Sequence, residues 1–371
     1  MAEWKECTIG DICNSVSETY SRHDDYVVLI NTSDVLEGKF LTHKSSKNED
    51  LKGQFKKTFK KDDILYSEIR PANKRYAFVD FDNTENYIAS TKLMVIRPNK
   101  TLVLPNFLYL LLTSKNLIDE MQHLAETRSG TFPQITFSGE LATFPINLPP
   151  LTTQKKISDI LSCIDAKIEL NNKINDNLEQ QAQAIFKNCF VGNSEKTHTI
   201  GEYIVPHRGK NLLSKDAVFG DVPVIAGGLE PATYHNVANT KAPVLTISAS
   251  GANAGYVNLW NIPVWSSDSS YIDSEMTKDV YFWYILLKLR QKEIFDSQTG
   301  SAQPHIYPQH ISVLPISELD YKKVSLFTKQ VTPFFEKIGA THQENLNLIA
   351  LRNTLLPKLM SGELDVDSVQ L

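Results

Sequence analysis

The feature that most constrains this chain is an internal duplication, because its two halves carry the same series of motifs in the same order. The first half opens with Thr8-Ile-Gly-Asp-Ile12 and the second with Thr199-Ile-Gly-Glu-Tyr-Ile204. Short β-rich runs broken by Gly, Pro, Asn and Asp follow each opening, as in Asp63–Tyr66 and Pro243–Ile247. A repeat of this length predicts two copies of one fold.

Each half continues with a compact apolar helix, a Gly/Ser/Thr loop and a strand that contains a proline. These segments are 107–112, 128–134 and 144–146 in the first half, and 282–287, 299–305 and 314–316 in the second. We interpret the aromatic dipeptide Phe282-Trp283 as part of the core and not as a stacking platform for bases.

A long amphipathic helix ends each half. At a constant offset of 170 residues, Ile157 matches Phe327 and Asn175 matches Asn345. Apolar residues recur three or four positions apart, which predicts one apolar stripe on each helix. Two helices of about 35 residues, roughly 50 Å long, should pack as an antiparallel pair. The residues expected to pack or to bind partners are Ile157, Leu161, Ile164, Ile168, Leu178, Phe186, Val331, Phe334, Ile338, Leu348 and Leu356.

Three residues bear on the ends and register of these helices. Thr152 or Thr153 is the expected N-cap of the first helix. Pro333 predicts that the second helix kinks or begins nearby, because proline is unfavourable inside a helix. Asn171 falls on the apolar stripe, where a buried polar residue fixes register at some cost in stability.

The predicted fold is α+β, with two similar α/β domains joined by a pair of long antiparallel helices in a pseudo-twofold arrangement. The expected segments are a first recognition domain (1–150), a central long helix (151–192), a second recognition domain (193–320) and a C-terminal helix and tail (321–371). The helices alone would suit any coiled-coil spacer. Combined with duplicated domains, they suggest two readers for two half-sites on DNA.

Charge is unevenly distributed along the chain. The net charge is −5, yet residues 39–75 contain eleven Lys/Arg against five Asp/Glu. That pattern is compatible with DNA on one face and protein partners on another. No apolar run is long enough to span a bilayer, and the four cysteines form no CxxC pair. We therefore expect a cytoplasmic protein with free thiols and no membrane contact.

Three stretches resemble Type I restriction-modification specificity subunits. They are 148–157 (Leu-Pro-Pro-Leu-Thr-Thr-Gln-Lys-Lys-Ile), 168–186 and 351–366, which contains Leu-Leu-Pro-Lys-Leu-Met-Ser-Gly-Glu-Leu-Asp-Val. The resemblance implies two target-recognition domains, each reading part of a split double-stranded DNA site. It implies a helical platform for two methyltransferase subunits, with restriction subunits joining the assembly. S-adenosylmethionine, ATP and Mg²⁺ chemistry would belong to those partners.

The residues themselves suggest no catalysis in this chain and no cofactor or metal site. Asn147-Leu-Pro-Pro-Leu151 lacks the aromatic residue that an adenine methyltransferase stacks on the flipped base. Gly251 and Gly255 form an isolated GxxxG, more typical of a turn, and no GxxxxGK[ST] or HExxH occurs. Asp63 and Glu68 superficially resemble a nuclease carboxylate pair but lack further acidic partners.

Base readout should come from Arg, amide and hydroxyl side chains on loops. The candidates in the first domain are Arg70, Lys74, Arg75, Arg128, Ser129, Thr131 and Gln134. The candidates in the second are Ser248, Ser250, Asn253, Ser301, Gln303, His305 and Tyr307. Arg70 suits a guanine and Gln134 an adenine.

Two other function classes remain open. One is a self-contained DNA modification enzyme with fused recognition domains, which requires a cofactor-binding domain. The other is a coiled-coil scaffold that binds only protein, which loops without amides and arginines would favour.

Overall fold

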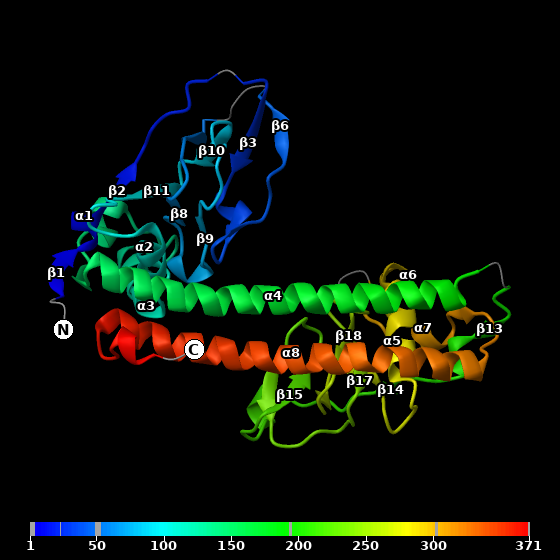
Figure 1. Cartoon of the computed structure of the whole chain (residues 1–371). Helices are drawn as coiled ribbons and strands as arrows, with labels where there is room; N and C mark the ends of the chain where they lie inside the picture. Colours follow the sequence, from blue (N-terminus) through cyan, green and yellow to red (C-terminus); the bar gives the residue numbers. More distant parts are fainter. Residues whose placement is uncertain (1–3, 23, 49–52, 193–194, 301–302, 370–371) are drawn as a thin grey trace. The chain divides into compact units, whose positions relative to one another are not determined.

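The computed structural model describes residues 4–22, 24–48, 53–192, 195–300 and 303–369 (Figure 1). Its contacts divide the chain into two compact units. Unit 1 comprises residues 1–166 together with 348–371, and unit 2 comprises residues 167–347. Each of the two long helices contributes residues to both units.

Unit 1 contains two four-stranded sheets (Figure 1). The first is antiparallel, in the order β2 (Cys13–Val16), β11 (Leu93–Pro98), β8 (Ile64–Ser67) and β9 (Tyr76–Phe78). The second has the order β6 (Ser45–Lys47), β3 (Tyr26–Ile30), β10 (Tyr87–Ser90) and β7 (Phe55–Lys57), with β3 and β10 parallel. All four residues of β8 are buried, so the predicted strand at 63–66 is confirmed as a central one.

Helices and short elements complete unit 1. They are β1 (Lys5–Thr8), α1 (Ile9–Ile12), η1 (Thr32–Asp34), β4 (Val35–Leu36), β5 (Lys39–Phe40), η2 (Pro71–Asn73), α2 (Pro105–Leu112), α3 (Lys115–Arg128), η3 (Phe137–Leu141) and β12 (Pro145–Leu148). β1 pairs antiparallel with β12 and so joins the start of the unit to its end.

Unit 2 repeats this plan. Its main sheet has the order β14 (His207–Arg208), β20 (Ser269–Asp273), β17 (Val244–Ser248) and β18 (Val257–Trp260), all antiparallel. A smaller sheet has the order β16 (Thr233–His235), β15 (Val222–Ile225) and β19 (Trp265–Ser266), with β15 and β19 parallel. The remaining elements are β13 (His198–Thr199), η4 (Ile200–Glu202), η5 (Ser214–Asp216), α5 (Val280–Leu289), α6 (Gln291–Asp296), α7 (Pro308–Ser312) and β21 (Pro315–Ile316).

The repeated opening motif has the same structure in both units. The backbone amide of Thr8 donates to the carboxylate of Asp11 at 2.7 Å, and that of Thr199 donates to Glu202 at 2.8 Å. Each forms a capping box at the first helical turn. A glycine is needed at the third position of the motif, because a Cβ on Gly201 would lie 2.9 Å from Ser312.

The two long helices are α4 (Leu151–Phe190) and α8 (Tyr321–Ser361), of 40 and 41 residues; a short turn, η6 (Val366–Ser368), follows α8. They run antiparallel within each unit (Figure 1). In unit 2, Asn171 donates to Asn345 at 2.8 Å, and Thr341 donates to Asn175 at 2.6 Å. The predicted role of Asn171 on the stripe is thus matched by a buried partner on the other helix.

One prediction about the helix ends is wrong. Thr152 and Thr153 lie inside α4, which begins at Leu151, and the carbonyl of Pro150 accepts the first helical hydrogen bond from Gln154 at 2.9 Å. Buried Gln154 also donates from its side chain to the carbonyl of Pro149 at 2.8 Å and accepts from the amide of Leu104 at 2.9 Å, so it ties the start of α4 to the loop before α2. α8 begins at Tyr321 and continues through Pro333, because packing of its apolar side outweighs the local cost of proline.

Candidate nucleic-acid interface

In unit 1, two loops from distant parts of the sequence are joined by backbone hydrogen bonds. The amide of Arg70 donates to the carbonyl of Pro133 at 3.1 Å, and the amide of Ile135 donates to the carbonyl of Glu68 at 2.8 Å. We call segments 68–75 and 129–136 the paired loops of unit 1. They bring together Arg70 and Gln134, the two base-reading candidates of this domain with the most specific predicted partners.

Unit 2 has equivalent loops with equivalent bonds. The amide of Gly251 donates to the carbonyl of Pro304 at 3.1 Å, and the amide of Ile306 donates to the carbonyl of Ala249 at 2.9 Å. We call segments 249–254 and 299–307 the paired loops of unit 2. The duplication therefore extends beyond the sheets to the loops that carry most of the predicted DNA-reading residues.

Arg70 occupies the position that Gly251 occupies in the repeat. Both residues have a left-handed backbone, with φ of 45° for Arg70 and 82° for Gly251. This conformation costs a non-glycine residue roughly 1–2 kcal/mol. The side chain of Arg70 is exposed, and no described residue accepts a hydrogen bond or an ion pair from it. A strained backbone that carries an unused cationic side chain points to a role outside the fold of the chain itself.

Lys92 links the paired loops of unit 1 and was not predicted from sequence. Its Nζ lies 3.5 Å from Oε1 of Gln134 and 3.4 Å from Oε2 of Glu68. Lys57 holds the backbone on both sides of Lys92, because its Nζ donates to the carbonyls of Thr91 at 3.0 Å and Leu93 at 2.9 Å. Burial lowers the pKa of Lys57. Lys92 lies in a two-residue connection between strands, where no local pattern distinguishes it from an ordinary surface lysine.

The other cationic candidates of unit 1 are engaged within the chain. Lys74 forms an ion pair with Glu37 at 2.7 Å, and Arg128 forms one with Glu140 at 2.8 Å. Arg75 donates to two backbone carbonyls next to β4, at 3.2 and 3.3 Å. Lys74 and Arg128 remain exposed enough to contact phosphate, whereas Arg75 has a structural use.

The hydroxyl and amide candidates differ in access. Ser129 accepts a hydrogen bond from the amide of Phe132 at 3.1 Å, and Thr131 is exposed. Ser248 is only 4% exposed, so it cannot reach a base without movement of β17. Asn253 is partly exposed within a tight turn. Gln303 is exposed, and Ser301 lies outside the described residues.

In unit 2, Asp268 takes the place of Lys92. The amide of Ala249 donates to the carbonyl of Asp268 at 3.1 Å, as the amide of Glu68 does to that of Lys92. The carboxylate of Asp268 accepts hydrogen bonds from Ser250 and, at 2.6 Å, from Arg208. Arg208 is a further cation that the sequence reasoning missed.

The second loop of unit 2 presents aromatic rings. The rings of His305 and Tyr307 are stacked with centroids 5.9 Å apart and an angle of 13° between them. His305 corresponds to Gln134, since each forms a β-bridge with the partner loop. The same backbone arrangement therefore carries different polar and aromatic side chains in the two units.

The nuclease-like acidic residues have structural partners. Asp63 is 1% exposed and bonded to Arg97, and Glu68 pairs with Lys92. Among the described residues, no group of His, Cys, Asp and Glu has an arrangement that could hold a metal ion. The described helices also include none with the length and apolar character needed to cross a membrane.

Eight of the eleven residues of the predicted helix stripe belong to or pack against the core clusters of the two units. None of its eleven residues is exposed, and Phe335, which the repeat did not single out, is more buried than Phe334. The helices carry other apolar residues on their outer faces. These are Leu170 (52% exposed), Leu326 (67%) and Leu346 (56%) in unit 2, and Ile349 (36%) and Leu351 (40%) in unit 1.

Known proteins share both the sequence and the fold. Residues 1–180 match the Type I restriction modification DNA specificity domain. Over 192 residues the chain is 53% identical to the Type I restriction enzyme HindI specificity subunit of Haemophilus influenzae, which covers 52% of this chain. That alignment spans only 41% of the Haemophilus protein.

Two further relatives match over more of their length. The Type I restriction enzyme MjaIX specificity subunit of Methanocaldococcus jannaschii is 25% identical over 316 residues, which cover 72% of this chain and 71% of that protein. The crystal structure of the Type-I restriction-modification system S subunit from M. genitalium has a TM-score of 0.55 at 18% identity, covers 97% of this chain and 96% of that one, and shows the shared fold. Residues 1–180 thus carry a Type I restriction modification DNA specificity domain, and the chain as a whole is similar in sequence and fold to the Type I specificity subunits named above.

Proposed function

We propose that this chain binds double-stranded DNA and reads a bipartite site, one half through the paired loops of each unit. It acts without catalysis of its own, within a complex that contains two methyltransferase subunits and, when cleavage occurs, restriction subunits. S-adenosylmethionine, ATP and Mg²⁺ are then needed only by those partners. The relatives are named specificity subunits, and selecting a DNA sequence is a role that loops such as these can perform.

The observation that carries the proposal is the contrast between Arg70 and Gly251. The repeat shows that a glycine satisfies this backbone position, yet unit 1 keeps an exposed arginine there. Arginine presents a rigid fork of donors that matches N7 and O6 of guanine in the major groove. Gln134 beside it presents the amide that pairs with adenine.

The test is Arg70→Gly in the chain co-expressed with its methyltransferase partner. Glycine relieves the left-handed backbone, so the thermal stability should stay equal or rise. The methylated sequence should lose discrimination in one half of the site only, by about 1–3 kcal/mol at the affected base pair. Asn83→Gly is the matched control, because Asn83 also has a positive φ (61°) but lies away from the paired loops. Methylome sequencing reports both variants.

Partner docking is best supported at the outer faces of the long helices. The predicted stripe residues, Leu178 among them, contribute to the chain's own packing, so a charge there would disturb the fold before it disturbed assembly. Leu170 and Leu346 are exposed apolar residues on these helices. Leu346→Glu should prevent assembly with methyltransferase subunits in native mass spectrometry while leaving the melting temperature unchanged; Asn347→Glu is the exposed control.

The rival function is a self-contained modification enzyme. It predicts that the purified chain alone transfers a labelled methyl group from S-adenosylmethionine to DNA. The proposal predicts transfer only when the methyltransferase subunit is added. Methylation of DNA by the isolated chain would contradict the proposal and support the self-contained enzyme.

A further inference from the structure

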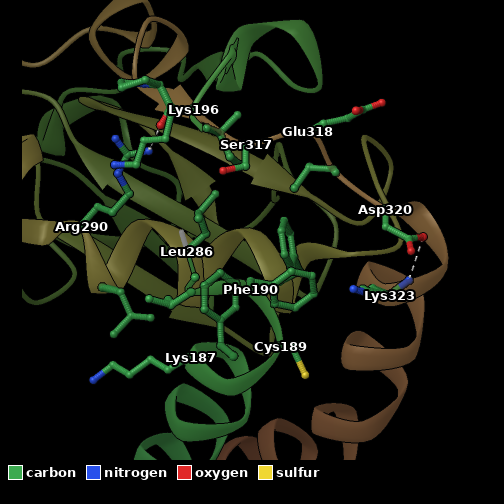
Figure 2. A pocket seen from close by; sticks show the side chains of 18 of the residues that line it. Lys187, Cys189, Phe190, Lys196, Leu286, Arg290, Ser317, Glu318, Asp320 and Lys323 are labelled. Carbon is green, nitrogen blue, oxygen red and sulfur yellow. Dashed lines mark hydrogen bonds between the residues drawn. The ribbon is translucent and has the colours of Figure 1, made fainter. Parts of the chain in front are cut away.

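An open apolar pocket of about 640 Å³ lies in unit 2, beside the last turns of α4 (Figure 2). Its floor is formed by Phe186 and Phe190 of α4, Phe282 and Leu286 of α5, and Ile316 of β21. All five belong to or pack against the core of unit 2. The pocket is thus a gap in the cover of that core.

Three lysines stand at the edge of this pocket (Figure 2). Lys187, Lys196 and Lys323 are exposed, and no ion pair joins any of them to another residue in the described ranges. Two of the acidic side chains that line the pocket already have partners within the chain. Glu293 pairs with Arg290, and Asp320 accepts a hydrogen bond from the first turn of α8 at 2.9 Å. Glu318 also lines the pocket and is exposed, so the edge carries both signs of charge, and its three lysines offer cations to the carboxylates of a ligand.

In unit 1, the corresponding apolar surface at the end of α8 is covered by the chain's own C-terminal segment. Leu356, Met360 and Ile146 stand 170 positions from Phe186, Phe190 and Ile316 and belong to or pack against the core cluster of unit 1. Leu364 and Val366, which follow helix α8, pack in that cluster as well, and Val366 is only 8% exposed. The chain turns back after α8 through left-handed Gly362, and the amide of Leu364 donates to the carbonyl of Lys358 at 3.1 Å.

Unit 2 has no such cover from its own chain among the described residues. After α4 the chain of unit 2 runs on into β13, and Lys196 on the way lines the edge of the pocket as an exposed cation. Val191, the first residue after α4, is 66% exposed. The segment that covers the core of unit 1 therefore indicates the kind of chain that would fill the pocket of unit 2.

We propose that this pocket receives an extended segment of a partner protein with aliphatic side chains at alternate positions between carboxylates, like Glu363-Leu-Asp-Val-Asp367 of this chain. The aliphatic side chains enter the floor that Phe190 and Leu286 form, and the carboxylates meet the three lysines. The partner's identity as a methyltransferase subunit rests on the proposed function, whereas the chemistry of the pocket does not.

The first experiment measures binding to the full chain without DNA or partners. The probe is a fluorescent peptide with the sequence of residues 361–369, followed by fluorescence polarisation. Saturable binding is expected, and a photo-crosslinking version should label residues 282–290. The peptide carrying both Leu364→Asp and Val366→Asp should not bind. Equal binding of the two peptides, or no binding of either, overturns the proposal.

Charge reversal at the edge tests the pocket without disturbing the core. Lys187→Glu combined with Lys323→Glu should weaken peptide binding about tenfold at low salt. Lys322→Glu is the matched control, because Lys322 neighbours Lys323 on α8 but does not line the pocket. Unchanged binding by the double variant counts against the proposal.

Two measurements separate this inference from its alternatives. If the full chain dimerises in sedimentation velocity and Lys187→Glu combined with Lys323→Glu abolishes the dimer, the occupant is a second copy and the partner proposal is wrong. If the Lys187→Glu/Lys323→Glu variant loses peptide binding but assembles with methyltransferase subunits as tightly as the unaltered chain, the inference fails while the proposed function stands. Weaker assembly of that variant supports the inference.

Discussion

Arg97 donates two hydrogen bonds of 2.8 Å, from Nε and Nη2, to the two carboxylate oxygens of Asp63. The carboxylate is 1% exposed and the arginine side chain 20%. The pair spans β11 and the start of β8 in the central sheet of unit 1. The carboxylate that superficially resembled a nuclease ligand thus has a structural partner.

The first prediction concerns the stability of this pair. Arg97→Ala leaves the buried Asp63 carboxylate without its cation and should lower the free energy of unfolding by about 3 kcal/mol. Lys100→Ala, which breaks the exposed ion pair with Asp62, should leave it unchanged. Urea denaturation of the two variants provides the comparison. Equal stability of Arg97→Ala and the unaltered chain would contradict a stabilising role for this pair.

The duplicated order of motifs was sufficient to predict two similar α/β domains and two long helices. Sheet order follows less directly, because strands such as β14 and β19 contain only two residues and have no periodicity to detect. The start of α4 was misjudged because tertiary contacts decide it: the side chain of Gln154 bonds to Pro149 and to the loop before α2. Packing of the apolar side of α8 keeps that helix continuous through Pro333.

The reading site was predictable only in part. Arg70 and Gln134 stood out because each follows a strand or lies in a polar loop, and the structure brings their loops together. Lys92 and Arg208 depend on contacts over more than 20 residues in sequence, which no local pattern reveals. The burial of Ser248, which is 4% exposed, was not predictable because a serine in a strand can face either side of the sheet.

The second prediction concerns pH. Hydrogen bonds from the backbone amide and then the hydroxyl of Thr8 lower the pKa of the Asp11 carboxyl. Because the folded-state pKa is depressed, the stabilisation is present above the unfolded pKa of about 3.9 and is lost as pH falls through the folded value. Thr8→Val should raise the pKa of Asp11 only partly, since the backbone amide remains. An NMR titration of the Asp11 carboxyl measures this; complete loss of the shift would contradict the order of causes.

The third prediction concerns the polar contact between the helices in unit 2. Asn171 and Asn345 are 1% and 7% exposed and bonded to each other. Replacing either asparagine with Leu leaves the side-chain amide of the other buried without its hydrogen-bond partner. Replacing both with Leu removes the two polar groups together. A double-mutant cycle should give a coupling energy of about 0.5–3 kcal/mol. Strict additivity in thermal or chemical unfolding would show that the contact does not specify register.

The fourth prediction divides recognition between the units. Lys92→Ala releases Gln134 and should relax the same half of the methylated site as Gln134→Ala. Gln303→Ala and Arg208→Ala should affect only the other half. Lys74→Ala, if Lys74 contacts phosphate, should weaken binding to all sequences and lower the salt slope by about one. Methylome sequencing of each variant, with filter binding over a salt series, distinguishes these effects; a change in both halves from Lys92→Ala alone would refute separate readers.

The last prediction concerns the spacing between the two halves of the site. If α4 and α8 set that spacing, lengthening both should change the spacer and leave the bases unchanged. An insertion of about seven residues preserves the apolar stripe, which recurs every 3.5 residues. The helices can be interrupted where the units divide, between Ala166 and Lys167 in α4 and between Asn347 and Leu348 in α8. Such an insertion lengthens each helix by about 10 Å.

That length corresponds to about three base pairs along DNA. The methylome of a host with the lengthened chain should therefore show the same two half-sites separated by a longer spacer. An insertion in α4 alone is the control, because it shifts one stripe against the other and should prevent folding of the helix pair. New bases in either half-site with an unchanged spacer would show that the helices do not measure the distance, and that the loops sense the separation through the DNA instead.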